Sequence, residues 1–236
     1  PDSLFKHKEA IKYKIGFFFF DKYYDEQFRK LDSINVKKSE KNNFINSLAI
    51  TTYPDSGFIS FEMIREDKGT SSNRFDFEIK KFSNVELGIS DILFSKKITI
   101  EKSKGIRRGK FYIEPNPLNH FTKNDTINLY YEVYNLYRNE RGIFNFEQKI
   151  SMKKINKKFE SGLEKIISSI SDFLGITENP EVVIISDYKT LENNPQIILQ
   201  LDMKNYSSGK YLFVITVKDK VTMKEVSSQT FVDWKN

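Results

Sequence analysis

Residues 74–80 read RFDFEIK, and polar and apolar side chains alternate strictly along them. On an extended backbone, Phe75, Phe77 and Ile79 lie on one side and the charged residues lie on the other. A period of two is typical of a β-strand with one face buried and the other in solvent. This stretch therefore predicts a half-buried strand.

The same period recurs on both sides of this stretch. Apolar residues occupy every second position of residues 11–19, 59–63 and 127–133, and turn sequences such as PDSG at 54–57 separate such runs. Several short strands with no helix of crossover length between them favour antiparallel layers over a parallel sheet. The sequence therefore predicts an all-β fold of two tandem antiparallel β-sandwich domains of immunoglobulin-like type.

One segment departs from the strand pattern. Apolar residues between Phe159 and Leu174 recur at steps of three and four, Ser161 and Glu164 form a capping-box pattern, and Gly175 follows. This spacing predicts a short amphipathic helix in the second domain. Such a helix could close the core as a lid or could dock a partner.

The excess charge is confined to one place. The chain has a net charge of +6, and residues 96–110 hold seven basic side chains against Glu101 alone. The sequence on either side carries equal numbers of acidic and basic residues. Two neutral halves joined by a basic segment predict an N-terminal domain over residues 1–101, a linker over 102–109 and a C-terminal domain over 110–236.

The basic segment also supplies candidate binding residues, namely Lys102, Lys104, Arg107 and Arg108. They could form a solvated interdomain segment, a surface for an anionic polymer or membrane headgroups, or a nucleic-acid contact. Aromatic side chains that would stack on bases are not interleaved with them, so nucleic acid is the least favoured partner.

Tyr130 and Tyr134 fall on the nominally polar face of their predicted strand. Amphipathic rings in such a position suit a protein interface or a platform for stacking sugars. Packing against the neighbouring domain or the helix is the alternative.

The sequence contains none of the motifs that mark common catalytic chemistries. The chain has no cysteine, which excludes disulfides, thiolate nucleophiles and cysteine-based metal sites. Its two histidines, His7 and His120, lack a second histidine or a carboxylate at metal-ligand spacing. Neither a nucleophile elbow nor a phosphate-binding or dinucleotide-binding loop is present. We therefore expect neither an enzyme nor a bound cofactor or metal.

Location can be predicted only in outline. The aromatic run Phe17–Phe20 is far shorter than the roughly 20 apolar residues that span a bilayer, so we expect no transmembrane segment. The chain begins at Pro1 without a signal-peptide pattern, and we interpret it as part of a longer precursor with an extracytoplasmic destination, in the periplasm or at the cell surface.

Three segments carry a family resemblance: LGISDILF at 87–94, FYIEPNP at 111–117 and LYYEVYNL at 129–136. In this order, and followed by LDM at 201–203, SGKY at 208–211 and VKD at 217–219, they resemble the C-terminal region of bacterial GWxTD-domain proteins. The resemblance spans about residues 85–234. The Gly-Trp-x-Thr-Asp motif is absent, because the only tryptophan is Trp234, and no functional residue can be transferred.

The resemblance implies β-sandwich portions of an exported or envelope-associated protein. Taken with the absence of a catalytic motif, it predicts a non-catalytic interaction or structural module of a bacterial cell-envelope protein, with another protein as its partner. A binding module for an anionic polymer or a carbohydrate is the alternative. The oligomeric state stays open at this point.

Overall fold

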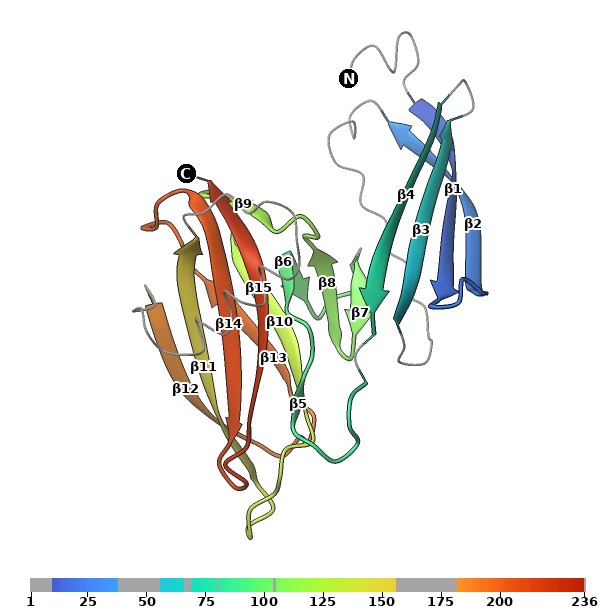
Figure 1. Cartoon of the computed structure of the whole chain (residues 1–236). Helices are drawn as coiled ribbons and strands as arrows, with labels where there is room; N and C mark the ends of the chain where they lie inside the picture. The colour runs from blue at the N-terminus through green and yellow to red at the C-terminus, as the bar shows by residue number, and fades with distance from the viewer. Residues whose placement is uncertain are drawn as a thin grey trace. The chain divides into compact units, whose positions relative to one another are not determined.

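The computed structural model describes residues 10–37, 56–65, 69–79, 81–103, 105–155 and 182–235. The chain divides into two compact units, Pro1–Phe82 and Ser83–Asn236 (Figure 1). All regular elements of the described residues are β-strands, as predicted, and these residues hold no helix long and apolar enough to cross a membrane. The predicted helix at 159–174 lies outside the described residues.

The described residues of the first unit form one antiparallel sheet of four strands in the order β2-β1-β3-β4 (Figure 1). The strands are β1 (Ala10–Asp21), β2 (Glu26–Lys37), β3 (Ser56–Arg65) and β4 (Gly69–Glu78). Asp21 stabilises the β1–β2 turn, where its carboxylate accepts hydrogen bonds from the backbone N–H groups of Tyr23 (2.8 Å) and Asp25 (3.0 Å). Acceptance of local backbone donors is a common role of aspartate in turns.

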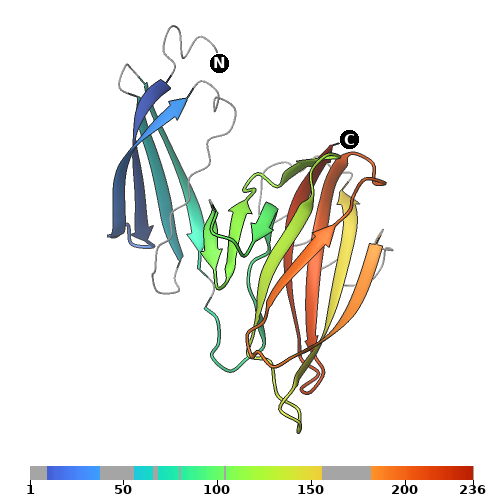
Figure 2. The same cartoon turned by 180° about the vertical axis from the view of Figure 1, so that it is seen from behind.

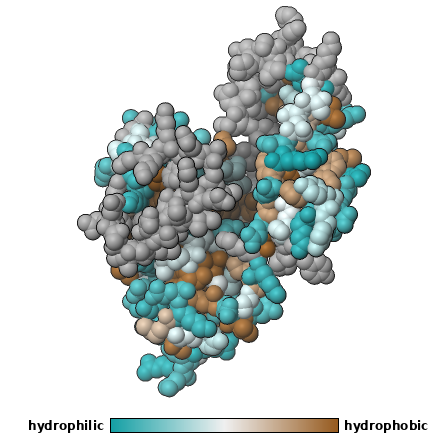
Figure 3. Space-filling model, in the orientation of Figure 1, coloured by the Kyte–Doolittle hydropathy of each residue, from teal (hydrophilic) through white to brown (hydrophobic). Residues whose placement is uncertain are grey.

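The predicted period of two appears in the register of this sheet. Phe19 of β1 is paired with Ile59 of β3, which is paired with Phe75 of β4, so these side chains share one face. Phe19 is 2% exposed and contacts the edge of the Phe77 ring, but Phe75 keeps 48% of its surface exposed. Figure 3 shows hydrophobic residues scattered among hydrophilic ones on the visible face of this unit.

The sequence pattern predicts a second sheet in the first unit, whereas its described residues form one sheet. Alternation records that one face of a strand is apolar, but it does not say whether a second sheet covers that face. Burial is correspondingly sparse, since Ile11 and Phe19 are the buried apolar side chains among the described residues of this unit.

In the second unit, the residues that the structure describes form two sheets. One has the order β13-β10-β6-β8-β7, with β5 (Gly88–Ile89) also paired to β10. Its strands are β6 (Leu93–Thr99), β7 (Ile106–Arg108), β8 (Phe111–Pro115), β10 (Ile127–Tyr134) and β13 (Gln196–Leu201).

The other sheet has the order β12-β11-β14-β15-β9, and both sheets are visible from behind in Figure 2. Its strands are β9 (His120–Thr122), β11 (Phe144–Ile155), β12 (Val182–Thr190), β14 (Gly209–Asp219) and β15 (Glu225–Lys235). The strand pairs of the described residues are antiparallel except β15–β9, which is parallel.

Side chains from both sheets form one core. Phe94 of β6 lies 5.7 Å from Phe213 of β14, measured between ring centroids, and the Tyr131 hydroxyl of β10 donates a hydrogen bond to Gln148 of β11. Trp234 of β15 is 1% exposed, and its indole N–H donates to the Tyr206 carbonyl at 3.1 Å. Aromatic side chains thus make up much of the contact between the two sheets.

The boundary between the units differs from the predicted linker. The chain divides between Phe82 and Ser83, and the basic segment 102–109 belongs to the second unit. The segment begins after β6, includes β7 and ends in the β7–β8 turn. β6 and β7 each pair with β8. An exposed connection between consecutive strands of one sheet accommodates excess charge as readily as an interdomain linker does, so charge alone cannot separate the two cases.

Candidate functional site

The predicted basic residues lie on this connection and on β7. Lys102, Arg107 and Arg108 are exposed, while Lys104 lies outside the described residues. The Arg107 guanidinium donates a hydrogen bond to the Gly109 carbonyl at 3.2 Å. Lys102 lies between β6 and β7, apart from the two arginines in sequence.

The turn of the β7–β8 hairpin lies close to the Gln196 side chain of β13. Gly109 has a φ of +55°, and a Cβ atom added there would lie 2.6 Å from the amide group of Gln196. A side chain at this position would therefore meet both backbone strain and a close contact. The hairpin turn thus lies against the β13 end of the same sheet.

Tyr130, Glu132 and Tyr134 occupy alternate positions of β10, and we call them the Tyr–Glu cluster. The Tyr130 hydroxyl donates to one carboxylate oxygen of Glu132 at 2.5 Å, and the Tyr134 hydroxyl donates to the other at 2.8 Å. Burial of the rings, together with the hydrogen bonds to Glu132 and its charge, raises the pKa of both tyrosines well above the ordinary value. Arg108 of β7 is paired with Phe111 of β8, whose ring lies 6.4 Å from that of Tyr130, which places Arg108 near the cluster. Its positive charge opposes the rise in both pKa values.

The two tyrosines differ in accessibility. Tyr130 is 3% exposed, and the Phe111 ring of β8 lies 6.4 Å from it, so Tyr130 offers no open stacking platform. Tyr134 is half-buried and Arg108 is exposed. The structure thus brings Arg108, Tyr130 and Tyr134 together, but a partner could reach only Arg108 and part of Tyr134. Glu132 was not predicted, although its position between two tyrosines on one strand face was the available signal.

We expect the second unit to lose stability above about pH 10, where tyrosines of an unfolded chain ionise. Burial raises the pKa of Tyr131, as burial and Glu132 do for Tyr130 and Tyr134, so the unfolded state releases these protons first and gains population as pH rises. Urea unfolding followed by Trp234 fluorescence at pH 8 and above pH 10 measures the loss. A Tyr130→Phe, Tyr134→Phe variant should lose less across the same interval, and an equal loss would contradict the assignment.

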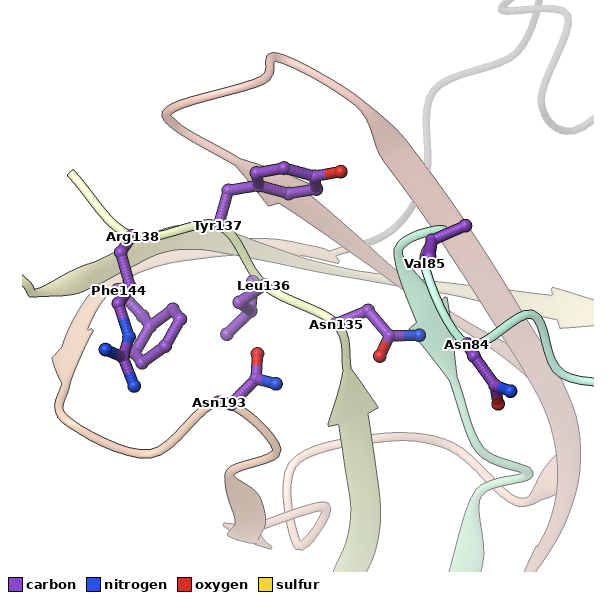
Figure 4. Close-up of a pocket in the computed structure, with 8 residues that line it drawn as sticks. All are labelled: Asn84, Val85, Asn135, Leu136, Tyr137, Arg138, Phe144 and Asn193. Atoms are coloured by element: carbon purple, nitrogen blue, oxygen red, sulfur yellow. The ribbon is translucent and has the colours of Figure 1, made fainter.

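A pocket of about 400 Å³ lies elsewhere on the second unit (Figure 4). It is lined by Asn84, Val85, Asn135, Leu136, Tyr137, Arg138, Phe144 and Asn193. In Figure 4, Leu136 and Tyr137 point to opposite sides of their segment, and the Arg138 guanidinium lies beside the Phe144 ring, 5.2 Å from its centroid. The side chains of Asn84 and Asn193 form no hydrogen bond among the described residues. Two amides and a guanidinium could therefore bind a polar group.

Asp219 positions one wall of this pocket. Its side chain is fully buried, and its carboxylate accepts hydrogen bonds from the backbone N–H groups of Tyr137 (2.7 Å), Val221 (2.7 Å) and Thr222 (2.9 Å). Asn135, at a φ of +59°, donates from its side chain to the Ser83 and Glu86 carbonyls at 2.8 and 2.9 Å. The segment carrying Leu136 and Tyr137 is thereby fixed at both ends. Its residues are distant in sequence from Asn84 and Asn193, so sequence spacing gave no sign of the pocket.

The remaining candidates are plain surface features. His120 opens β9, and its Nε2 atom lies 3.2 Å from the Asp233 carboxylate of β15 at the surface, while His7 lies outside the described residues. In the part of the chain that the structure describes, no three histidine, aspartate or glutamate side chains are grouped as a metal site.

Comparison with known proteins gives no relative from which a role could be carried over. No protein-family model matches the sequence, and a search of curated proteins finds no match. The resemblance to GWxTD-domain proteins therefore stays a prediction.

Proposed function

We propose that the chain is a non-catalytic interaction module of a bacterial cell-envelope protein, which contacts a partner protein through Arg108 and Tyr134. The observation that carries this proposal is the Tyr–Glu cluster on a structured sheet, with exposed Arg108 on the strand pair whose Phe111 ring packs near Tyr130. Arginine and tyrosine are enriched among the residues that dominate binding energy, especially where packing fixes them beforehand. The hydrogen bond to Glu132 holds the Tyr134 ring in place before a partner arrives.

We also infer that the second unit is an immunoglobulin-like β-sandwich. Its shared core, contributed by both sheets, supports this inference, and such sandwiches commonly carry binding surfaces on a stable framework. The envelope location rests on the predicted resemblance alone.

Affinity capture from an envelope fraction tests the proposal, with the whole chain as bait. We expect one partner protein to be recovered, and its recovery to fall at least tenfold with Arg108→Ala or Tyr134→Ala, since truncation of a dominant contact costs about 2 kcal/mol or more. Lys235→Ala, an exposed cation on β15, is the matched control and should leave recovery unchanged. Equal recovery with all three variants would refute the assigned surface.

The same material tests the alternative, an anionic polymer. Its supporting observation is the exposure of Lys102, Arg107 and Arg108 on one connection. Binding to a polyanion should weaken steeply with salt, and replacement of Lys102, Lys104, Arg107 and Arg108 by glutamine should flatten that dependence. Binding that is insensitive to salt and to these replacements would eliminate the alternative.

A further inference from the structure

Among the described residues, no strand covers the outer edge of β4. β4 is the last strand in the order β2-β1-β3-β4, and it pairs with β3 along all ten residues without a register shift. Residues 69–76 are all exposed, and no described strand pairs with the outer edge. Such an edge presents a row of backbone N–H and C=O groups to another strand.

The middle of β4 is complementary to itself. Arg74, Phe75 and Asp76 place a cation, an aromatic ring and a carboxylate in succession. Neither Arg74 nor Asp76 forms an ion pair or a side-chain hydrogen bond among the described residues. We propose that two copies of the chain pair through antiparallel β4 strands around a two-fold axis at Phe75, which joins their sheets into one of eight strands, four from each copy.

In this register, Arg74 and Asp76 of each copy both gain an oppositely charged partner. With Phe75 opposite Phe75 of the partner subunit, Arg74 lies opposite Asp76 of the partner subunit, and the two-fold axis repeats that pair. Opposite charges and paired aromatic rings are both stabilising when they face each other across an antiparallel pair. The interface is self-complementary without any change in the fold of the unit.

The faces of the sheet also match. Phe75 lies on the same face as Ile59 and Phe19, so the proposed pairing continues the apolar face across the axis and covers a ring that is 48% exposed. The charged pairs fall on the opposite face, because side chains alternate along a strand.

The other edge of the sheet is less suitable. β2 contains a similar triplet, Lys30, Leu31 and Asp32, but Lys30 is paired with Phe17, so its charges fall on the apolar face. The register between β1 and β2 also shifts between Phe19 and Phe20, and such irregularities discourage edge pairing. β4 is therefore the edge that we assign to the interface.

The inference rests on the proposed role as an interaction module and names a second copy of this chain as one of its partners. An extended segment of a different protein could also add to the edge, and the experiment separates the two cases. Failure of self-pairing would leave capture through Arg108 and Tyr134 untouched, because those residues belong to the second unit.

Sedimentation equilibrium of the whole chain is the first test. We expect a reversible dimer between micromolar and millimolar concentration, as befits a small interface. Arg74→Asp or Asp76→Arg alone should weaken the dimer roughly tenfold or more, since each places like charges together at two symmetric positions. An equimolar mixture of the two single variants, or the double variant Arg74→Asp, Asp76→Arg, should restore association. Lys30→Asp on β2 is the matched control and should change nothing.

Crosslinking through an introduced cysteine locates the axis directly. The chain has no cysteine of its own, so any disulfide must form at the introduced position. In a Phe75→Cys variant the two thiols would lie opposite each other, within the Cα separation of about 4.4–6.8 Å that a disulfide requires. A mild added oxidant should then join the chains, accepting two electrons as two protons leave. Ser72→Cys is displaced from its own symmetry mate and should stay uncrosslinked.

Two results would overturn the proposal: a chain that stays monomeric throughout this range, or a dimer that is insensitive to the charge variants. A monomer whose Arg74→Asp variant fails to recover an envelope protein that the wild type captures would point to a different partner on the same edge. Circular dichroism of each variant should match the wild type, which confirms that the sheet is intact.

Discussion

Replacement of Trp234 by alanine should lower the free energy of unfolding of the second unit by about 3–5 kcal/mol, because it opens a large cavity in a packed aromatic core. Trp234 is 1% exposed and belongs to the cluster that both sheets form. It is paired with Gly209 of β14 on one side and with Phe121 of β9 on the other, so neighbouring side chains cannot easily fill the space. Urea unfolding followed by circular dichroism measures the loss.

A Trp234→Phe variant is the matched comparison. It keeps an aromatic ring but removes the indole N–H that donates to Tyr206, so the loss should fall to about 1–3 kcal/mol. This variant also keeps the test interpretable if the alanine variant fails to fold. An alanine variant that loses less than about 1 kcal/mol would show that Trp234 lies outside the core.

Replacement of Asp219 by alanine should cost about 3 kcal/mol, since it leaves three backbone N–H donors without their charged acceptor. The donors belong to the β14–β15 turn and to Tyr137 in the pocket wall. We therefore expect the turn and the 135–138 segment to loosen together, while β11 and β14 keep their pairing. Urea unfolding measured by Trp234 fluorescence gives the energy, and NMR chemical shifts of residues 135–138 show the local change.

Asp219→Asn is the control for shape. The asparagine side chain is nearly isosteric and keeps one carbonyl oxygen, so the cost should be smaller, about 1–2 kcal/mol. Asp202, next to β13, is exposed and accepts one backbone hydrogen bond, from the N–H of Lys204. Its replacement by alanine should therefore cost less than about 1 kcal/mol. Equal losses for Asp219→Ala and Asp202→Ala would contradict the role assigned to the buried carboxylate.

Much of the strand content could be predicted from the sequence, because a half-buried strand leaves a period of two. Residues 74–80 overlap β4, and residues 127–133 fall within β10. The number of sheets in the first unit could not be predicted, since the same alternation arises in one sheet or in two. The unit boundary also escaped prediction, because charge excess marks exposed backbone rather than a domain edge.

The candidate site was predictable only where its members share one strand. Tyr130 and Tyr134 are separated by an even number of positions, so their common face can be predicted from the sequence. The packing of the Phe111 ring near Tyr130 cannot be predicted in this way. Arg108 is brought near them by the β7–β8 hairpin, in which it is paired with Phe111, and that pairing leaves no signal in the spacing of the two tyrosines. Pocket residues from three distant segments leave no local pattern.

The sparse burial in the first unit governs how often its hydrogen-bonded ladder opens. With Ile11 and Phe19 as the buried apolar side chains of its described residues, little apolar contact opposes separation of β1 from β3. In heavy water, the amide protons of these strands can therefore exchange through openings that leave β11 and β14 closed. We therefore expect separate opening energies for the two units and a melting curve that does not fit a single transition.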